Sequence, residues 1–396
     1  MTEKNLDIVV YGATGFTGGL CVKYLKENYP EIKIALGGRN KKKLQAVAEK
    51  NGLTCEIFVA EGGDSGALDK ITKRVRVVLS TAGPFHRYGS KMVASCVKNN
   101  THYVDITGEN FWVREMIIKH HEEARKKGVR IVPACGYDSI PSDLGVFFAA
   151  TSFGGPLKSV FSYHTWKGEA SGGTIETMFA IRDLKIDRSA FGLFSLNPKN
   201  SITGEQKKLT SDRVSVEKNS TIGAWTGPFI MAAANTRVVR RSAALLDEIG
   251  RGYGKNFIYK ESAYYSKKSR AYITTLMLGV LGFVIMTPLR KIVRPLLKKP
   301  GQGPSKAVMD SGFFKCKLVA TGESGKQKTY VMAGSGDPGY KVTSKFVCES
   351  ALSLLEKHEN LPGGFGYGGI LTPSSGLGDT LVDRLKSVGI SFEEII

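Results

Sequence analysis

The sequence DIVVYGATGFTGGL, residues 7–20, places a series of glycines directly after a short run of β-branched residues. The run IVV at 8–10 is apolar without alternation, which is typical of a fully buried strand rather than an amphipathic one. Gly12, Gly15 and Gly18 then recur at intervals of three residues. The pattern predicts a strand followed by a tight turn that carries few side chains.

A helix is expected directly after this turn, from about 16 to 26. The N–H groups at a helix N-terminus lack internal partners and carry partial positive charge, so an anion fits there. Glycine lets a pyrophosphate approach the main chain closely. The spacing is G-x-x-G-x-x-G rather than the commoner G-x-G-x-x-G, and a glycine-rich turn without a ligand is the alternative. The residues expected to bind a dinucleotide here are Gly12, Thr14, Gly15, Phe16, Thr17 and Gly18.

The second expected strand bears on the choice between the two nicotinamide dinucleotides. In IKIALGGRNKKKLQ, residues 32–45, the strand ends at the paired glycines and Arg39 follows. Domains of this kind that prefer NAD carry an acidic residue here, on the ribose hydroxyls. This chain has none, and a guanidinium can hold a 2′-phosphate with two hydrogen bonds. We therefore expect NADP(H), with Arg39 on the 2′-phosphate, and the lysines at 41–43 as a solvated helical turn.

Four more strands are expected along the next hundred residues, with helices between them, most clearly at 112–127. They lie in CEIFVAEGGD (55–64), RVRVVLSTAGPF (74–85), HYVDITGE (102–109) and VRIVPACGYD (129–138). This alternation predicts an α/β fold with a doubly wound parallel sheet, the Rossmann arrangement. Ligands bind such sheets at the carboxyl ends of the strands. We therefore expect Asp64 to lie near the adenine, and Ala82 and Gly83 to contact the cofactor.

Composition, net charge and cysteine content bear on the partners and the cellular compartment of the protein. The 396 residues carry a net charge of +20, and they are enough for two domains with buried cores. No basic helix interleaved with aromatic residues occurs, so we expect no nucleic-acid partner; a membrane surface or an acidic substrate accounts better for the charge. A strand almost at the N-terminus and the C-terminal FEEII match no signal peptide or retention address, so we expect a protein that is not secreted. The six scattered cysteines favour a reduced, intracellular compartment and no metal site: Cys21, Cys55, Cys96, Cys135, Cys316 and Cys348.

An apolar segment of about 17 residues, 271–287, lies between two groups of basic residues within 266–306. Its length is at the lower edge of what crosses a bilayer, and positive charge on both sides gives no orientation. One interpretation is a buried helix of a second domain. The other, which the dense basic flanks favour, is insertion into a membrane or lipid-droplet surface through 271–299.

Six motifs resemble the saccharopine dehydrogenase-like oxidoreductases in order and approximate spacing. They are GATGFTGG (12–19), GGRNKKKL (37–44), TAGPFHRYG (81–89), YVDITGE (103–109), CGYDSIPSDLG (135–145) and GDPGYKV (336–342). The resemblance covers most of the chain and thins between about 185 and 260. EASGGTIETMFAI, at 169–181, is more similar to the trans-acting enoyl reductase branch than to the animal lipid-droplet branch. The residues with which a true saccharopine reductase recognises glutamate and lysine have no match, so that activity is not expected.

The resemblance implies a nicotinamide-dependent reductase of lipid metabolism with three segments. These are a Rossmann domain at 1–150, an α+β domain with an antiparallel sheet at 151–360, and a C-terminal segment at 361–396 that returns to the Rossmann domain. The residues agree, because SGFFKCKLVATG (311–322) and KTYVMAG (328–334) read as antiparallel strands. A glycine-rich loop leading into an amphipathic helix follows at 361–390.

The sequence offers only a few candidates for a catalytic proton donor. Hydride transfer needs positioning, a dry pocket and sometimes one proton donor, which should follow the ends of the later strands. We expect Tyr137 to be this donor, because a phenol can protonate an enolate and this loop is the most family-specific motif. The alternative is that Tyr137 and Asp138 cap the helix that begins near residue 141. The other candidates in this region are His86, Arg87, Tyr88, Asp105, Glu109 and Asp138.

Three functions remain open at this point. The leading one is an NADP(H)-dependent reductase acting on a lipid-like substrate, including the carbon–carbon double bond of an enoyl chain. The second is a non-catalytic lipid-surface scaffold that retains a Rossmann domain. The third is a soluble imine or carbonyl reductase in which 271–287 is part of the core.

Overall fold

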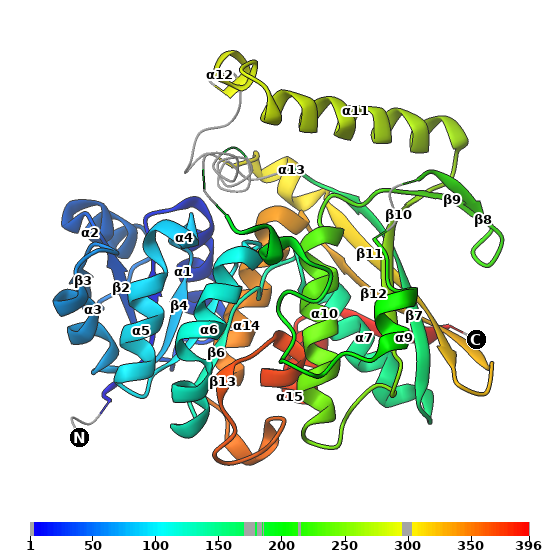
Figure 1. The fold of residues 1–396 in the computed structure, drawn as a ribbon. Coiled ribbons are helices and arrows are strands. Elements are labelled where there is room, and N and C mark those ends of the chain that lie inside the picture. Colours follow the sequence, from blue (N-terminus) through cyan, green and yellow to red (C-terminus); the bar gives the residue numbers. More distant parts are fainter. Residues whose placement is uncertain are drawn as a thin grey trace. The chain divides into compact units, whose positions relative to one another are not determined.

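The computed structural model describes residues 4–169, 179, 184, 186–212, 215–294 and 303–395 (Figure 1). The chain forms two compact units: one runs to Ile140 and includes Gly339–Val388, and the other consists of Pro141–Pro338 and the residues from Gly389 onward. These limits differ from the expected boundaries at 150 and 361. The chain re-enters the first unit at Gly339 because the helix that follows packs beside the first helix of that unit. The final strand belongs to the second unit, because it pairs with a strand there.

The first unit is built on a seven-stranded sheet in the order β13-β6-β5-β4-β1-β2-β3, with every neighbouring pair parallel. This confirms the expected doubly wound sheet. Its strands are β1 (Leu6–Tyr11), β2 (Ile34–Gly38), β3 (Ile57–Val59), β4 (Val75–Ser80), β5 (His102–Asp105), β6 (Arg130–Val132) and β13 (Gly369–Ile370). β1 lies inside the sheet, between β4 and β2, and its β-branched residues 8–10 are fully buried, as the sequence predicts.

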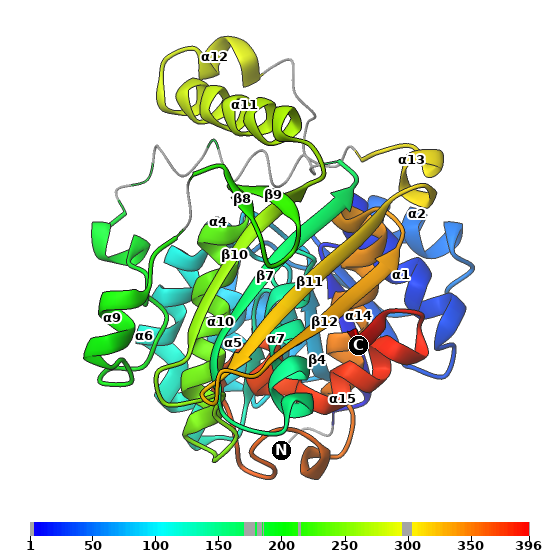
Figure 2. The same cartoon turned by 90° about the vertical axis from the view of Figure 1, so that its right-hand side faces the viewer.

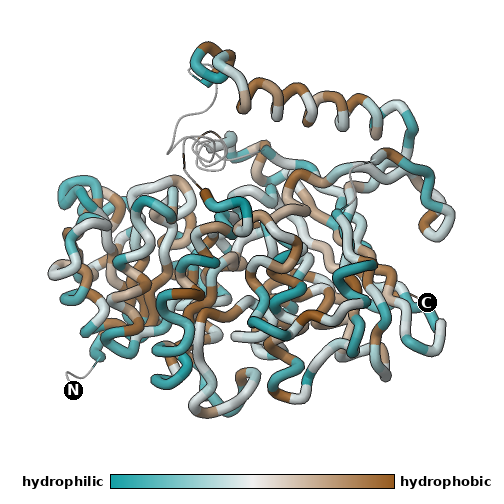
Figure 3. Tube along the Cα trace, viewed as in Figure 1, coloured by the Kyte–Doolittle hydropathy of each residue, from teal (hydrophilic) through white to brown (hydrophobic). Residues whose placement is uncertain are grey.

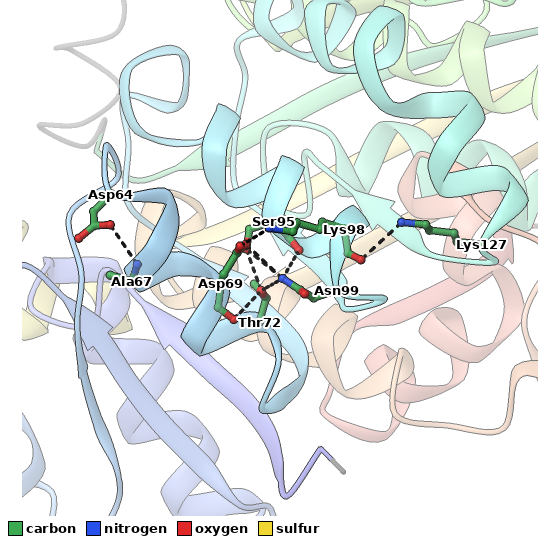
Figure 4. Close-up of polar contacts among 8 residues, drawn as sticks. All are labelled: Asp64, Ala67, Asp69, Thr72, Ser95, Lys98, Asn99 and Lys127. Carbon is green, nitrogen blue, oxygen red and sulfur yellow. Dashed lines mark hydrogen bonds and ion pairs between the residues drawn. The ribbon is translucent and has the colours of Figure 1, made fainter. Parts of the chain in front are cut away.

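The helices of the first unit form two packed groups, as expected when the winding reverses after β3. Helix α14 contacts both α1 and α15, and α5 contacts both α3 and α6. The helices are α1 (Phe16–Asn28), α2 (Lys41–Lys50), α3 (Ser65–Thr72), α4 (Phe85–Tyr88), α5 (Ser90–Lys98), α6 (Asn110–Lys126), α14 (Thr343–Ser353) and α15 (Pro373–Ser387), with a π-helical turn at Pro338–Val342. The Asp69 carboxylate joins two of these helices, because it accepts hydrogen bonds from Ser95 and Asn99 on and after α5 (Figure 4).

The second unit contains a mixed sheet in the order β14-β12-β11-β7-β10-β9-β8 (Figure 2). The expected antiparallel pair is confirmed as β11 (Phe313–Gly322) and β12 (Gln327–Ser335). The central pair, β7 (Leu157–Lys167) and β10 (Ile258–Tyr265), is parallel and was not expected. The remaining strands are β8 (Glu217–Asn219), β9 (Ala224–Gly227) and β14 (Ser391–Ile395), and the helices are α7 (Ile140–Phe153), α9 (Gly204–Leu209), α10 (Ala232–Asp247), α11 (Lys268–Met286), α12 (Arg290–Val293) and α13 (Lys306–Asp310).

A polar cluster is buried in the core of this second unit. The Glu261 carboxylate accepts hydrogen bonds from Ser142 Oγ, at 2.7 Å, and from Tyr259 Oη, at 2.6 Å, and His164 Nε2 lies 3.6 Å from it. Burial by itself lowers the pKa of His164, but Cys316 and Glu261 outweigh it and raise this pKa to about 10. The imidazole stacks on Phe229 with ring centroids 4.4 Å apart. The cluster links α7, β7 and β10 and is part of the unit's packing.

Helix α11 extends over the apolar segment, beginning three residues before the expected position and ending one residue earlier. Only 6% of its apolar window is buried, so the interpretation of 271–287 as a core helix is wrong. Its first turns pack on β9, where Lys268 lies 5.4 Å from the Trp225 ring and Ala271 is buried. The rest of the helix is exposed or partly exposed, and Figure 3 shows hydrophobic positions along its length.

Candidate functional site

The glycine turn after β1 is built so that side chains cannot enter it. Gly12 has a φ of +92°, and a Cβ there would lie 2.9 Å from both the Ala82 amide nitrogen and Thr81 Oγ1. A Cβ on Gly18 would lie 2.2 Å from the Gly12 carbonyl oxygen. The glycines therefore let α1 approach both the turn and the end of β4.

The N-terminus of α1 is available to an anion. Its N-cap is Gly15, which has no side chain to accept a hydrogen bond from the first turn. Thr14 is exposed beside it, and Phe16 and Thr17 begin the helix with part of their surface exposed. These features fit the pyrophosphate of a dinucleotide, since it needs backbone N–H donors and an absence of side chains.

The end of β2 fits a phosphorylated ribose. Arg39 follows Gly38 and is exposed, and its guanidinium carbon lies 6.0 Å from the centroid of the Tyr88 ring. Asn40, the next residue, caps α2 by accepting a hydrogen bond from the Lys43 amide. The lysines at 41–43 are solvated, as expected, and no acidic residue occurs in the segment 39–43 that directly follows β2.

One of the three remaining residues that we expect to contact the cofactor, Asp64, has a structural role as well. Asp64 is the N-cap of α3, with Oδ1 accepting a hydrogen bond from the Ala67 amide at 3.0 Å (Figure 4). Its carboxylate is thus used structurally, and a contact with adenine stays a prediction. Ala82 lies beside Gly12, and Gly83 is exposed at the end of the same turn.

At the carboxyl edge of the parallel sheet, Glu109 of the motif YVDITGE holds the backbone of the motif TAGPFHRYG by hydrogen bonds. The buried Glu109 accepts hydrogen bonds from the Phe85 and His86 amides, each at 2.9 Å, and from His86 Nδ1 at 2.6 Å. This arrangement fixes the turn after β4. Glu109 and His86, considered as proton donors from the sequence, are therefore paired with each other.

The buried Asp105 carboxylate acts similarly on the loop after β6. It accepts hydrogen bonds from the Thr107 and Ala134 amides and from Tyr103 Oη, at 2.9–3.0 Å. Burial raises the pKa of Asp105 to about 7, although the hydrogen bonds oppose this rise. The Cys135 amide also donates to the Asp105 carbonyl oxygen, so the loop is held on β5 at two successive residues.

The segment GDPGYKV joins the glycine turn to this loop, which sequence analysis did not anticipate. The buried Tyr340 ring makes an edge-on contact with Phe16, with centroids 4.7 Å apart. Thr343, three residues further on, accepts a hydrogen bond from the Tyr137 amide at 3.0 Å. One helical segment therefore contacts both the cofactor turn and the residue expected to donate the proton.

The two residues at the centre of the CGYDSIPSDLG motif differ in exposure. Tyr137 is buried, with 8% of its surface exposed. Asp138 is partly exposed, and in the described part of the chain its carboxyl forms no hydrogen bond or ion pair. Asp138 therefore does not cap the following helix, contrary to the alternative raised from the sequence. The motif EASGGTIETMFAI lies almost entirely outside the described residues.

Known proteins resemble the chain over its whole length. Residues 8–132 match the family described as the saccharopine dehydrogenase NADP binding domain. A Mycobacterium tuberculosis protein is 36% identical over 99% of this chain and 98% of its own length. A protein named trans-acting enoyl reductase from Mycobacterium ulcerans is 34% identical, and one from Mycobacterium leprae 31%, each over 98% of this chain and 97% of the relative.

This chain belongs to the saccharopine dehydrogenase-like oxidoreductases, in the trans-acting enoyl reductase branch. A solved structure, the apo saccharopine dehydrogenase (L-Glu forming) of Saccharomyces cerevisiae, shares the fold, with a TM-score of 0.54 over 100% of both chains. Its identity of 13% relates it by fold alone. The chain is therefore an oxidoreductase with an NADP-binding domain.

Proposed function

We propose that this protein is an NADP(H)-dependent enoyl reductase that reduces a carbon–carbon double bond in a lipid-like substrate. The observation that carries the proposal is the full-length similarity to proteins named trans-acting enoyl reductase. The glycine turn and Arg39 support NADP(H) as the cofactor, since their geometry fits a pyrophosphate and a 2′-phosphate.

The reaction divides between the cofactor and the chain. Reduced NADP, when bound, supplies the hydride that adds to the β-carbon of the enoyl group. The glycine turn and the N-terminus of α1 would hold the pyrophosphate, and Arg39 the 2′-phosphate. The loops fixed by Asp105 and Glu109 would shape the substrate side of the site, because both follow strands whose carboxyl ends face the ligand in this fold.

We further propose that the enzyme works at the surface of an intracellular membrane or lipid droplet, reached through α11 and the basic residues around it. Exposed apolar side chains follow one another along this helix, with Leu276, Met277 and Phe283 each more than 60% exposed. Lys267, Lys268 and Arg270 precede them. An apolar face this large with a basic margin fits the interface of an anionic lipid layer.

The experiment that tests the proposal follows NADPH oxidation by the full-length protein. The probe is trans-2-hexadecenoyl N-acetylcysteamine thioester in phospholipid vesicles, compared with the matching 3-keto thioester and a cyclic imine. Faster oxidation with the enoyl thioester, and recovery of the saturated product by mass spectrometry, are expected. NADPH binding with no turnover of any probe would favour the scaffold, and turnover of the ketone or imine alone would favour a carbonyl or imine reductase.

A further inference from the structure

Asp138 is the acidic residue of the first unit's candidate site that the fold leaves without a partner. The other two carboxylates there are engaged: Asp105 accepts three hydrogen bonds, and Glu109 holds two amides and the His86 ring. The Asp138 carboxyl makes none within the described residues. A carboxyl that is only partly exposed and has no protein partner, in a loop held by hydrogen bonds on both sides, is a candidate for a functional role.

The loop that carries Asp138 is held firmly on both sides. Before it, Ala134 and Cys135 donate amide hydrogen bonds to Asp105, and the Tyr137 amide donates to Thr343. After it, the Ile140 amide donates to the Gly136 carbonyl oxygen as α7 begins. Position 138 is therefore fixed at the carboxyl edge of the sheet, which is the arrangement that a group acting on a bound substrate requires.

We infer that Asp138, rather than Tyr137, is the proton donor of the enoyl reduction. This inference rests on the proposed function. Asp138 is partly exposed and so can be reached by a substrate, whereas Tyr137 is buried in the same loop. The segment at 340–343 contacts both Phe16 of the cofactor turn and Tyr137, which places position 138 one residue from that connection.

The proposed proton transfer from Asp138 to the substrate conserves atoms and charge. Hydride addition at the β-carbon leaves an electron pair at the α-carbon, delocalised onto the thioester oxygen. The Asp138 carboxyl breaks its O–H bond, and the proton forms the new C–H bond at the α-carbon with that electron pair. The resulting carboxylate regains a proton from water, so the chain is unchanged after each turnover.

The protonation of Asp138 suits this role. The surrounding protein removes much of the hydration of its carboxyl, and this desolvation raises the pKa of Asp138 to about 6. Among the described residues, no charged group or hydrogen bond contributes to this rise in pKa. A carboxyl with a pKa close to neutral keeps a useful protonated fraction under cellular conditions, which an ordinary exposed aspartate does not.

The test compares Asp138→Asn with wild type, Tyr137→Phe, and the control Asp383→Asn, which alters an exposed aspartate on α15. We expect kcat with the enoyl thioester to fall about 100-fold or more in Asp138→Asn. NADPH affinity, followed by nicotinamide fluorescence, should stay within about two-fold of wild type, since a donor to the substrate does not hold the cofactor. A second readout is the infrared band of a protonated carboxyl. Because Asp105 contributes such a band in both proteins, the spectrum of Asp138→Asn is subtracted from that of wild type, and the remaining band should titrate near pH 6.

The possible results distinguish Asp138 from Tyr137 as the proton donor, and they separate failure of this inference from failure of the proposed function. Asp138→Asn with nearly full kcat, beside an inactive Tyr137→Phe variant, would overturn the inference and return the role to Tyr137. Loss of activity with a carboxyl that titrates at the ordinary aspartate pKa would also overturn it, since the proton would then be absent at neutral pH. Wild-type protein that binds NADPH but reduces no enoyl thioester would instead overturn the proposed function.

Discussion

Arg39 is the residue on which the cofactor preference depends. It lies at the end of β2, with no acidic side chain at that strand end, and its guanidinium lies over Tyr88. Arg39→Asp should weaken NADPH binding by at least ten-fold, because a carboxylate repels the 2′-phosphate, and should improve NADH binding. Fluorescence titration with both dinucleotides measures this change. An unchanged preference would remove Arg39 from the account.

Asp138 also affects stability in a direction set by its pKa. A folded-state pKa of about 6, above the ordinary 3.8, means that the folded protein binds this proton more tightly than the unfolded chain does. The carboxylate therefore costs stability as pH rises from about 4 to 6, and the cost persists above pH 6. Asp138→Asn should be about 1–3 kcal/mol more stable than wild type at pH 7.5, and equally stable at about pH 3, below both pKa values.

Thermal unfolding of the two proteins at both pH values measures this difference. A variant less stable than wild type at pH 7.5 would show that the Asp138 carboxyl is structural.

The sequence alone identified Asp138 only as one member of a group of candidate proton donors. The sequence could not rank these candidates, because their hydrogen bonds join loops that are distant in the sequence and no periodic pattern predicts them. The hydrogen bond from the Ala134 amide to the Asp105 carboxylate is an example.

At the scale of elements, the glycine turn is the feature most sensitive to substitution. Gly18→Ala would place a Cβ 2.2 Å from the Gly12 carbonyl oxygen, so α1 must move away from the turn. We expect a loss of about 1–3 kcal/mol of stability and at least ten-fold weaker NADPH binding. Gly155→Ala, where no atom lies within 4 Å of the new Cβ, is the matched control. Equal NADPH affinity in the two variants would contradict the role of this turn.

Helix α11 should bind lipid surfaces through its exposed apolar face. Leu276→Asp with Phe283→Asp replaces two side chains that are 69% and 62% exposed, so folding should be unaffected. We expect the variant to lose sedimentation with phosphatidylglycerol-containing vesicles, and wild-type binding to weaken with salt. Ile118→Asp, also 69% exposed but on α6, is the control. Vesicle binding that survives in the double variant would show that another surface is responsible.

Six of the seven strands of the parallel sheet could be predicted, because each is a short and mostly apolar segment followed by turn residues. β13 could not, since it has two residues and exists only through its pairing with β6. The exposure of α11 was also undecided, because composition alone does not separate a core helix from one that faces lipid.

At the scale of the whole molecule, each of the two units is built from two separate stretches of the chain, which the order of elements in the sequence does not reveal. The first unit closes with α14, which packs on α1, and α15, which packs on α14. The second unit closes with β14, which pairs with β12. The chain therefore crosses between the units near residues 140, 339 and 389, where sequence analysis placed boundaries at 150 and 361. GDPGYKV was recognised as a motif, but its contact with Phe16 is a property of the folded chain.

The measurement that tests the central claim most directly is a titration of the purified full-length protein with NADPH and, separately, with NADH, followed by nicotinamide fluorescence. The account predicts saturable NADPH binding that is at least ten-fold tighter than NADH binding, roughly 1.4 kcal/mol. Binding of neither dinucleotide would contradict it, since the glycine turn would then be a structural remnant and the protein a scaffold.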